Sequence, residues 1–275
     1  MEEFKTADDF KRFEDLNIQD NFLFQRIMLK KGLCIEFVRR ATSYDVKDVT
    51  YPEEEKVIEA GILSKGVRLD VYVIDETGKV YDMEMQLRMG EKGDLPRRTR
   101  YYQAMIDTDL LTKGNAYQDL NMTVIVFICT FDYFDKGLPV YTFSKTCKED
   151  KSVELGDDTV IIFLNTQYTV DNINPKLKAL LDYIDKQEIS DDFTKCLDEE
   201  AKFIKDSEKV RVQYMTYIAE IQDQRRQAHA EGREEERITN IKSIMQKLGM
   251  SAKKAMDVLN IAPSEQEKYL PQLQN

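Results

Sequence analysis

Apolar and polar residues alternate most clearly over residues 67–74, VRLDVYVI, and again over residues 79–87, KVYDMEMQL. This alternation predicts two strands, because successive side chains of a strand point to opposite faces of a sheet. The segment between them contains Gly78, which can adopt the positive φ of a tight turn. The sequence therefore predicts a hairpin in which Asp75 and Lys79 flank a three-residue loop.

Helical patterns lie on both sides of this hairpin. Apolar residues recur at near-helical intervals over residues 20–41, where Asp20 suits the N-cap position and Gly32 weakens the middle. After the hairpin, Pro96 suits the first turn of a helix, which we expect to run over residues 97–113.

Strands dominate the next part of the chain. The continuous apolar run at residues 122–130, MTVIVFICT, predicts a strand that is buried on both faces. Shorter patterns predict strands at residues 46–51, 139–143 and 159–164 and a helix at residues 174–186. This order of elements predicts an α/β fold in which helices flank a mixed sheet.

The composition changes after residue 190. Residues 197–248 are rich in Glu, Lys, Arg and Gln and follow a long helical pattern, and residues 251–271 predict two short helices. We therefore divide the chain into a core domain, residues 1–190, and a charged helical tail, residues 191–275.

The tail carries signals of its own. Ser251 is placed to cap the first short helix, and Ser264 with Glu267 matches a capping box for the second. Met215 and Ile218 belong to an apolar stripe on the long helix. Such a stripe either packs on the core or joins two copies of the chain, so a homodimer through the tail is one expectation.

Composition restricts the class of protein. The 275 residues, 42% hydrophobic and 33% charged, are typical of a soluble globular protein, and no apolar run approaches the roughly 18 residues that span a bilayer. The acidic start, MEEFKTADDF, lacks an apolar signal core, so we expect a cytoplasmic protein with no membrane segment. The four cysteines are widely spaced and His229 is the single histidine, which argues against a zinc centre and against a Ser-His or Cys-His nucleophile.

The net charge of −11 counts against simple nucleic-acid binding, which usually leaves a basic footprint. A localised basic groove is still compatible with this charge, and so is an acidic tail that offsets the core.

The predicted hairpin brings acidic residues together. Its register places Asp70 opposite Glu84, and Asp82 and Gln86 alternate onto the same face of the second strand. Opposed carboxylates repel each other, whereas a hard cation such as Mg²⁺ binds one or two carboxylates together with substrate phosphate. A solvent-exposed strand face is the alternative interpretation of these acids.

These residues also carry a family resemblance. The string VRLDVYVIDETGKVYDMEMQ resembles the signature hairpin of the PD-(D/E)XK nuclease superfamily, and more narrowly of the bacterial recombination-promoting nuclease and transposase family. The segments LPRRTRYYQAMIDTDLLTKGNAYQDLNMTVIVFICTFDYF, YTFSKTC and VIIFLN are similar to later parts of that family. The likeness covers roughly residues 15 to 190 and implies a restriction-endonuclease-like fold.

The resemblance implies a role for individual residues. Asp70 and Glu84 match the two acids that bind the metal, and the backbone carbonyl of Met85 matches a further ligand. Gln86 stands where the superfamily usually has Lys, so an amide replaces a positive charge. A helix acid often completes such sites, and Glu36 is the candidate here, with an ordinary helix-surface acid as the alternative.

Basic and aromatic residues follow the hairpin. Arg98 and Tyr102 lie one helical turn apart, with Arg97 and Arg100 beside them. We interpret these four residues as candidates for nucleic-acid binding, through phosphate contacts and stacking. Intrahelical pairing and packing of the tyrosine in the core is the alternative.

Two functions remain in competition at this point. The first is an endonuclease that hydrolyses DNA phosphodiesters with Mg²⁺ or Mn²⁺ and promotes recombination, as the resemblance implies. The second is a catalytically weak or inactive protein on the same fold, which binds nucleic acid or a protein partner, because Gln86 lacks the usual charge.

Overall fold

The computed structural model describes residues 10–52, 56–58, 66–111, 114–170 and 172–273. The chain divides into two compact units, residues 1–210 and residues 211–275, and each is described by itself.

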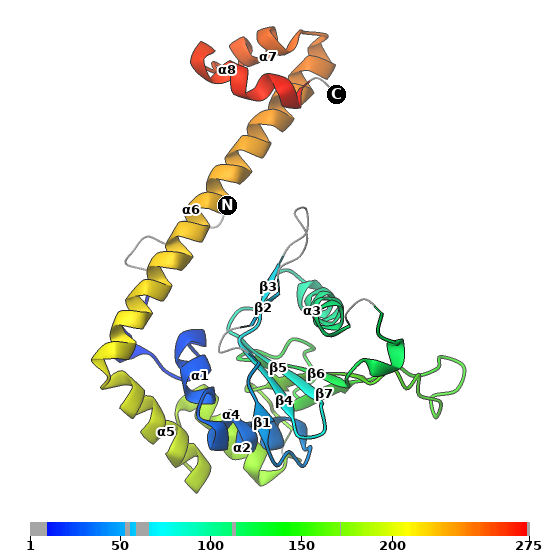
Figure 1. Ribbon diagram of the computed structural model, residues 1–275, viewed down its shortest axis with the longest axis vertical. Helices are drawn as coiled ribbons and strands as arrows, with labels where there is room; N and C mark the ends of the chain where they lie inside the picture. Colours follow the sequence, from blue (N-terminus) through cyan, green and yellow to red (C-terminus); the bar gives the residue numbers. More distant parts are fainter. Residues whose placement is uncertain (1–9, 53–55, 59–65, 112–113, 171, 274–275) are drawn as a thin grey trace. The chain divides into compact units, whose positions relative to one another are not determined.

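The first unit is built on a mixed six-stranded sheet, which confirms the predicted fold class (Figure 1). In spatial order its strands are β1 (Val49–Thr50), β4 (Val71–Asp75), β5 (Val80–Gln86), β6 (Thr123–Cys129), β8 (Thr159–Asn165) and β7 (Val140–Phe143). The neighbours β5, β6 and β8 are parallel, and the outer pairs are antiparallel. β6 is buried along its whole length, as expected from its apolar sequence.

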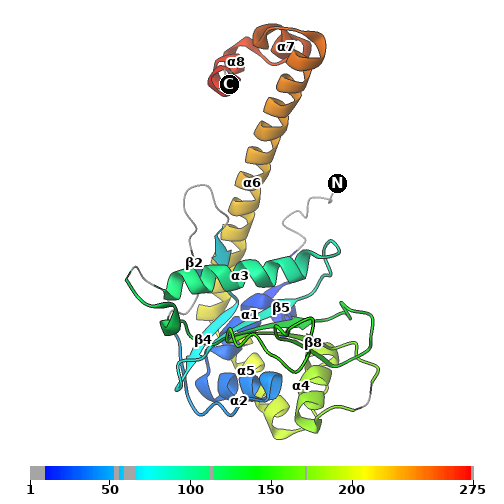
Figure 2. The same ribbon diagram turned by 90° about the vertical axis from the view of Figure 1, so that its right-hand side faces the viewer.

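Helices cover both faces of this sheet (Figure 2). One face is covered by α3 (Asp94–Leu110), and the other by α1 (Asn21–Met28), α2 (Lys31–Thr42), α4 (Pro175–Lys186) and α5 (Asp192–Lys205). Short 3₁₀ helices occur at η2 (Phe13–Asp15) and η3 (Tyr117–Asp119). The core on the α3 side includes Leu95 and Ile106 of α3, Val80 of β5 and Phe127 of β6. Even-numbered residues of β5 therefore face α3.

The single helix predicted over residues 20–41 is instead two helices. The chain leaves helical geometry at Lys30, which has extended backbone angles, while Gly32 lies in the first turn of α2. A continuous helix would place Lys31 one turn after Ile27, on the buried stripe. The break releases Lys31 from that stripe, and its ammonium group lies 2.5 Å from a carboxylate oxygen of Asp48.

The single strand predicted over residues 67–74 is also interrupted. Residues before the break form β3 (Val67–Arg68), which pairs with β2 (Val57–Ile58) in a separate two-stranded sheet. Leu69 and Tyr72 both belong to the core beneath α3, so the alternation changes phase between them. Asp70 lies at this change of phase, outside regular strand geometry.

The helix predicted over residues 97–113 begins earlier, at Asp94, after Gly93 in left-handed geometry. Its last regular residue is Leu110, and residues 112–113 lie outside the described residues. The strand predicted over residues 46–51 is shorter in the structure, where regular pairing in this segment covers β1.

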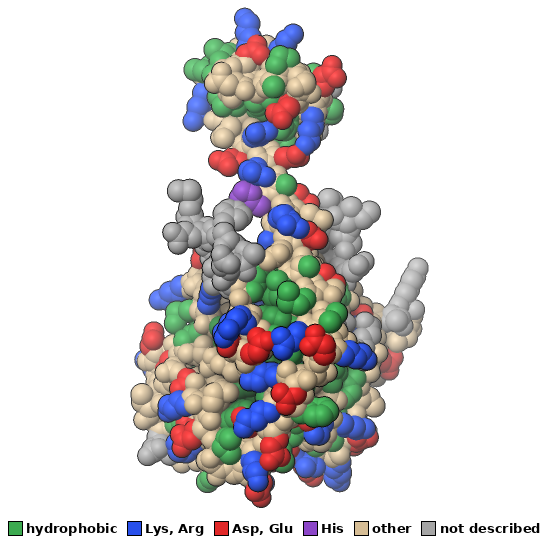
Figure 3. Space-filling view, turned by 90° about the vertical axis from the view of Figure 1, so that its left-hand side faces the viewer, with side chains coloured by type: hydrophobic (Ala, Val, Ile, Leu, Met, Phe, Trp, Pro, Cys, Tyr) green, Lys and Arg blue, Asp and Glu red, His purple; other side chains and the backbone are tan. Residues whose placement is uncertain are grey.

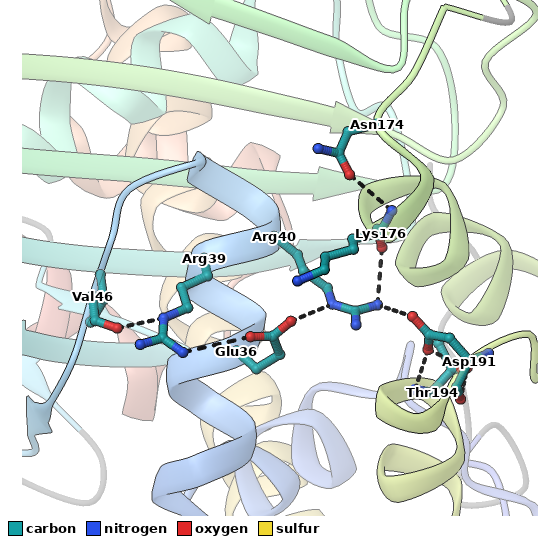
Figure 4. A network of polar contacts seen from close by, with 8 residues as sticks. All are labelled: Glu36, Arg39, Arg40, Val46, Asn174, Lys176, Asp191 and Thr194. Carbon is teal, nitrogen blue, oxygen red and sulfur yellow. Dashed lines mark hydrogen bonds and ion pairs between the residues drawn. The ribbon is translucent and has the colours of Figure 1, made fainter.

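α5 belongs to the first compact unit, which ends at residue 210. Figure 4 shows the contacts that hold this helix: Arg40 of α2 donates to Asp191, the N-cap residue of α5, at 2.5 Å. Arg40 also donates to the Lys176 carbonyl oxygen at 3.1 Å. One buried guanidinium therefore joins α2, α4 and α5.

The second unit contains most of α6 (Glu208–Leu248), together with α7 (Ala252–Val258), α8 (Pro263–Tyr269) and η4 (Leu270–Gln272). Its small core includes Ile241, Met256, Ile261 and Tyr269. Among the helices that the structure describes, none has both the length and the apolar character needed to cross a membrane.

The caps of the two terminal helices differ from each other. Ser251 accepts a hydrogen bond from the Lys254 N–H, as predicted. The predicted capping box at Ser264 is wrong, because α8 begins at Pro263 and its N-cap is Ala262, two residues before the predicted cap. Proline is favoured at the first helical position, where its missing N–H has no intrahelical partner to lose.

Gly232, in the exposed middle of α6, gives a first testable prediction. A Cβ atom added there would meet no atom within 4 Å, so Gly232→Ala is expected to stabilise the helix by about 0.5–1 kcal/mol. Amide hydrogen exchange around residue 232 should slow accordingly. Gly249 has a φ of +61°, so Gly249→Ala should have the opposite effect, and faster exchange in Gly232→Ala would contradict the prediction.

Candidate functional site

The hairpin of β4 and β5 has the predicted register. Val71 pairs with Met83, so the next residues outward, Asp70 and Glu84, lie opposite each other. The N–H of Asp70 donates to Oε1 of Glu84 at 2.9 Å, and the N–H of Met85 donates to Oδ2 of Asp70 at 3.1 Å. Each strand thus provides a backbone donor to the carboxylate of the other strand, which fixes both carboxylates at one place.

Two amides of α1 complete the surroundings of Asp70. Nδ2 of Asn21 lies 3.1 Å from Oδ1 of Asp70, and Nε2 of Gln25 lies 3.3 Å from the same oxygen. The sequence analysis did not identify these two residues. Their spacing of four places them on one face of α1 and was the available signal.

Glu36 does not lie with these carboxylates. Its Oε1 accepts from Nε of Arg40 at 2.9 Å, and its Oε2 lies 3.8 Å from Nη1 of Arg39 (Figure 4). These contacts fit the alternative interpretation of Glu36 as an ordinary acid on the surface of a helix. Asn21 and Gln25 are the residues of the N-terminal helices that contact Asp70.

Asp82 adds a third carboxylate to the site. It lies two residues before Glu84 on β5, on the face toward α3, and its side chain is fully buried. Neither of its oxygens has a hydrogen-bond partner among the described residues. A buried carboxylate without a partner is costly, so this site is built at the expense of stability. Because Asp70, Asp82 and Glu84 are buried, the alternative interpretation of these acids as an exposed strand face is wrong.

The three carboxylates oppose each other's ionisation. Burial raises the pKa of Asp70 to about 6, although the Met85 N–H and the charge of Arg98 act in the other direction. Burial is also the main cause that raises the pKa of Asp82 and of Glu84 well above their usual values, and the charge of Asp70 raises both further. A cation at this place would favour the ionised form of all three.

Arg98 of α3 reaches into the site. Its Nη1 donates to Oε1 of Gln86 at 2.9 Å, and its Nη2 donates to the hydroxyl of Tyr102 at 3.0 Å. The same Nη2 lies 3.7 Å from Oε2 of Glu84. Nε2 of Gln86 donates to the Arg88 carbonyl oxygen at 2.6 Å. The structure therefore brings Gln86, predicted as a catalytic residue, together with Arg98 and Tyr102, both predicted to bind nucleic acid.

Arg97 and Arg100 differ from Arg98 in their surroundings. Both are exposed on α3, and Arg97 donates weakly to the Gly93 carbonyl oxygen at 3.4 Å. They lie on the same helix as Arg98 but outside its buried contacts with the carboxylates.

The chemistry of the site suits a hard divalent cation. Asp70 and Glu84 supply carboxylate oxygens. Met85 follows Glu84 on β5, and its N–H donates to Asp70. Among the described residues, no group of three acidic, cysteine or histidine side chains is arranged around one ion position. Two carboxylates with a carbonyl oxygen and water or phosphate are the usual ligands of Mg²⁺, which retains several waters.

Comparison with known proteins identifies the family of the chain. The family model of PD-(D/E)XK nuclease family transposases matches residues 22–247. No curated protein and no solved structure matches the chain. The mixed sheet flanked by helices is consistent with the fold of that family. Because the match spans most of the chain and includes the whole hairpin, the chain belongs to the PD-(D/E)XK nuclease family transposases.

Proposed function

We propose that the chain is an endonuclease that hydrolyses DNA phosphodiester bonds with Mg²⁺ or Mn²⁺. Asp70 and Glu84 would hold the ion, together with the backbone carbonyl of Met85. A bound divalent cation supplies a water of lowered pKa and offsets the charge that develops on phosphorus. The observation that carries the proposal is that Asp70 and Glu84 are both buried and lie opposite each other. Each carboxylate accepts a hydrogen bond from a backbone N–H on the other side of the hairpin.

The protein residues have separate tasks in this proposal. The amides of Asn21 and Gln25 orient the carboxylate of Asp70 through Oδ1. Such outer contacts commonly change metal affinity or activity by 10–100-fold when they are removed. Asp82, once ionised, adds negative charge close to Asp70 and so strengthens the attraction of the site for a cation.

The overall charge of −11 makes DNA binding depend on local basic residues. Acidic and basic side chains lie close together on the face shown in Figure 3. Arg97 and Arg100, exposed on α3 near the site, are the residues that we propose for phosphate contact. Promotion of recombination, and a homodimer through the exposed Met215 of α6, are further parts of the proposal.

The test is cleavage of supercoiled plasmid by the purified full-length protein with Mg²⁺ or Mn²⁺ and, separately, with EDTA. Nicking is expected with the metal and not with EDTA. Asp70→Asn should abolish it, because an amide binds a hard cation much less well than a carboxylate. The matched control is Asp135→Asn at an exposed residue with a φ of +53°, where asparagine is well tolerated.

Each other outcome bears on the proposal directly. Nicking that persists in Asp70→Asn would show that the activity comes from another site or a contaminant. DNA binding without cleavage under either metal would overturn the proposal in favour of a protein that only binds nucleic acid.

A further inference from the structure

Both ends of the Gln86 amide bond to protein groups. Its oxygen accepts from Arg98 at 2.9 Å, and its nitrogen donates to the Arg88 carbonyl oxygen at 2.6 Å. The amide oxygen that accepts from Nη1 of Arg98 fixes the position of the guanidinium, so Gln86 is an anchor on β5 for Arg98.

The guanidinium of Arg98 is held on several sides. It lies 5.4 Å from the ring centroid of Tyr102 and 5.3 Å from that of Phe127, in addition to its hydrogen bonds. Its side chain is 30% exposed, against 6% for Glu84, 3.7 Å away. A positive charge is thus fixed beside a buried carboxylate while part of the group still faces solvent.

We propose that Arg98, from α3, provides the positive charge that a lysine at position 86 provides in related nucleases, and that Gln86 is the residue that positions it. This inference rests on the proposed nuclease function. A guanidinium has five N–H donors, and the hydrogen bonds to Gln86 and Tyr102 use two of them. The others can reach the phosphate oxygens on which charge develops during hydrolysis.

The glutamine at position 86 and its contact with Arg98 both fit a positive charge on α3 in place of one on β5. Replacing lysine by glutamine removes a charge from β5, and the glutamine oxygen then accepts from a charged group of the neighbouring helix. The charge then lies on α3 instead of β5, and the guanidinium of Arg98 is 3.7 Å from Oε2 of Glu84. Because arginine stays protonated at all working pH values, this charge would not titrate with the reaction.

The test moves the charge back to β5. Arg98→Gln is expected to lower the maximal rate of plasmid nicking about 100-fold, the usual effect of losing one transition-state donor. The double variant Gln86→Lys with Arg98→Gln should recover at least about tenfold of that loss, because the lysine then stands at the family's usual position. Arg97→Gln removes the same charge one residue earlier and should instead raise the DNA concentration needed for half-maximal rate.

The outcomes separate this inference from the nuclease function itself. Unchanged maximal rate in Arg98→Gln, with Asp70→Asn inactive, would overturn the role of Arg98 and leave the nuclease proposal intact. A double variant no more active than Arg98→Gln would also overturn it. Thermal unfolding of each variant monitors folding, and if Arg98→Gln does not fold, Arg98→Lys must retain more than a tenth of the rate. A wild-type protein that cleaves no DNA would overturn both proposals.

Discussion

Replacing Glu84 with glutamine is expected to lower metal-dependent cleavage at least about 100-fold and, at the same time, to stabilise the metal-free protein. The loss of activity follows from the loss of a charged metal ligand. The gain in stability follows because the pKa of the buried Glu84 is raised by burial and by the charges of Asp70 and Asp82. Glutamine keeps an oxygen that can accept from the Asp70 N–H, so the hairpin contact is retained.

Nicking rates and urea unfolding at pH 8 without metal measure the two effects. The expected gain in the free energy of unfolding is about 0.5–2 kcal/mol, the usual size of a single stabilising substitution. Glu231→Gln, at an exposed position of α6, is the matched control and should change neither quantity appreciably. A less stable and inactive Glu84→Gln would mean that Glu84 serves the fold and not the ion.

The second large effect is a change in the stability of the protein with pH and with bound metal. A raised pKa means that the folded state holds protons that the unfolded state has already released. The stability from such an acid is complete below its unfolded pKa, near 4, and is lost as the pH rises through its folded pKa. For Asp70 the rise in pKa from 3.8 to about 6 corresponds to a loss of about 3 kcal/mol in the free energy of unfolding above pH 7. Asp82 and Glu84 shift in the same direction.

The contribution of these buried acids to the stability of the metal-free protein should therefore be lost between pH 4 and pH 7, and Mg²⁺ or Mn²⁺ should restore the loss. At a concentration 100 times the dissociation constant, the ion adds about 2.7 kcal/mol. Binding at pH 6 should also release protons, measurable in buffers of different ionisation enthalpy. Acids with a lowered pKa, such as Asp132 and Asp191, contribute with the opposite sign, so the test compares wild type with Asp70→Asn. The stability of wild type relative to Asp70→Asn should fall from pH 4 to pH 7, and a relative stability that rises would contradict the predicted sign.

Much of the site could be predicted from local sequence. The register of β4 and β5 follows from a short turn and from alternation, both of which are properties of neighbouring residues. That register was sufficient to place Asp70 opposite Glu84. Arg98 and Tyr102 were also identified, because their spacing of four makes them neighbours on any helix.

Other features depend on contacts between distant elements, and local patterns did not show them. The break at Lys30 depends on which side chains the sheet buries, and the change of phase at Asp70 depends on β2. Glu36 and the pair Asn21 and Gln25 all lie on helices near the start of the chain. Only the packing of α1 and α2 decides which of them contacts Asp70.

The exchange of donors between β4 and β5 has a consequence for the order of assembly. Neither the Asp70 N–H nor the Met85 N–H reaches its acceptor unless the two strands are aligned to the residue. A slip by a single position would break both bonds together. The proposed metal site would therefore form only in a hairpin whose strands are paired in the correct register.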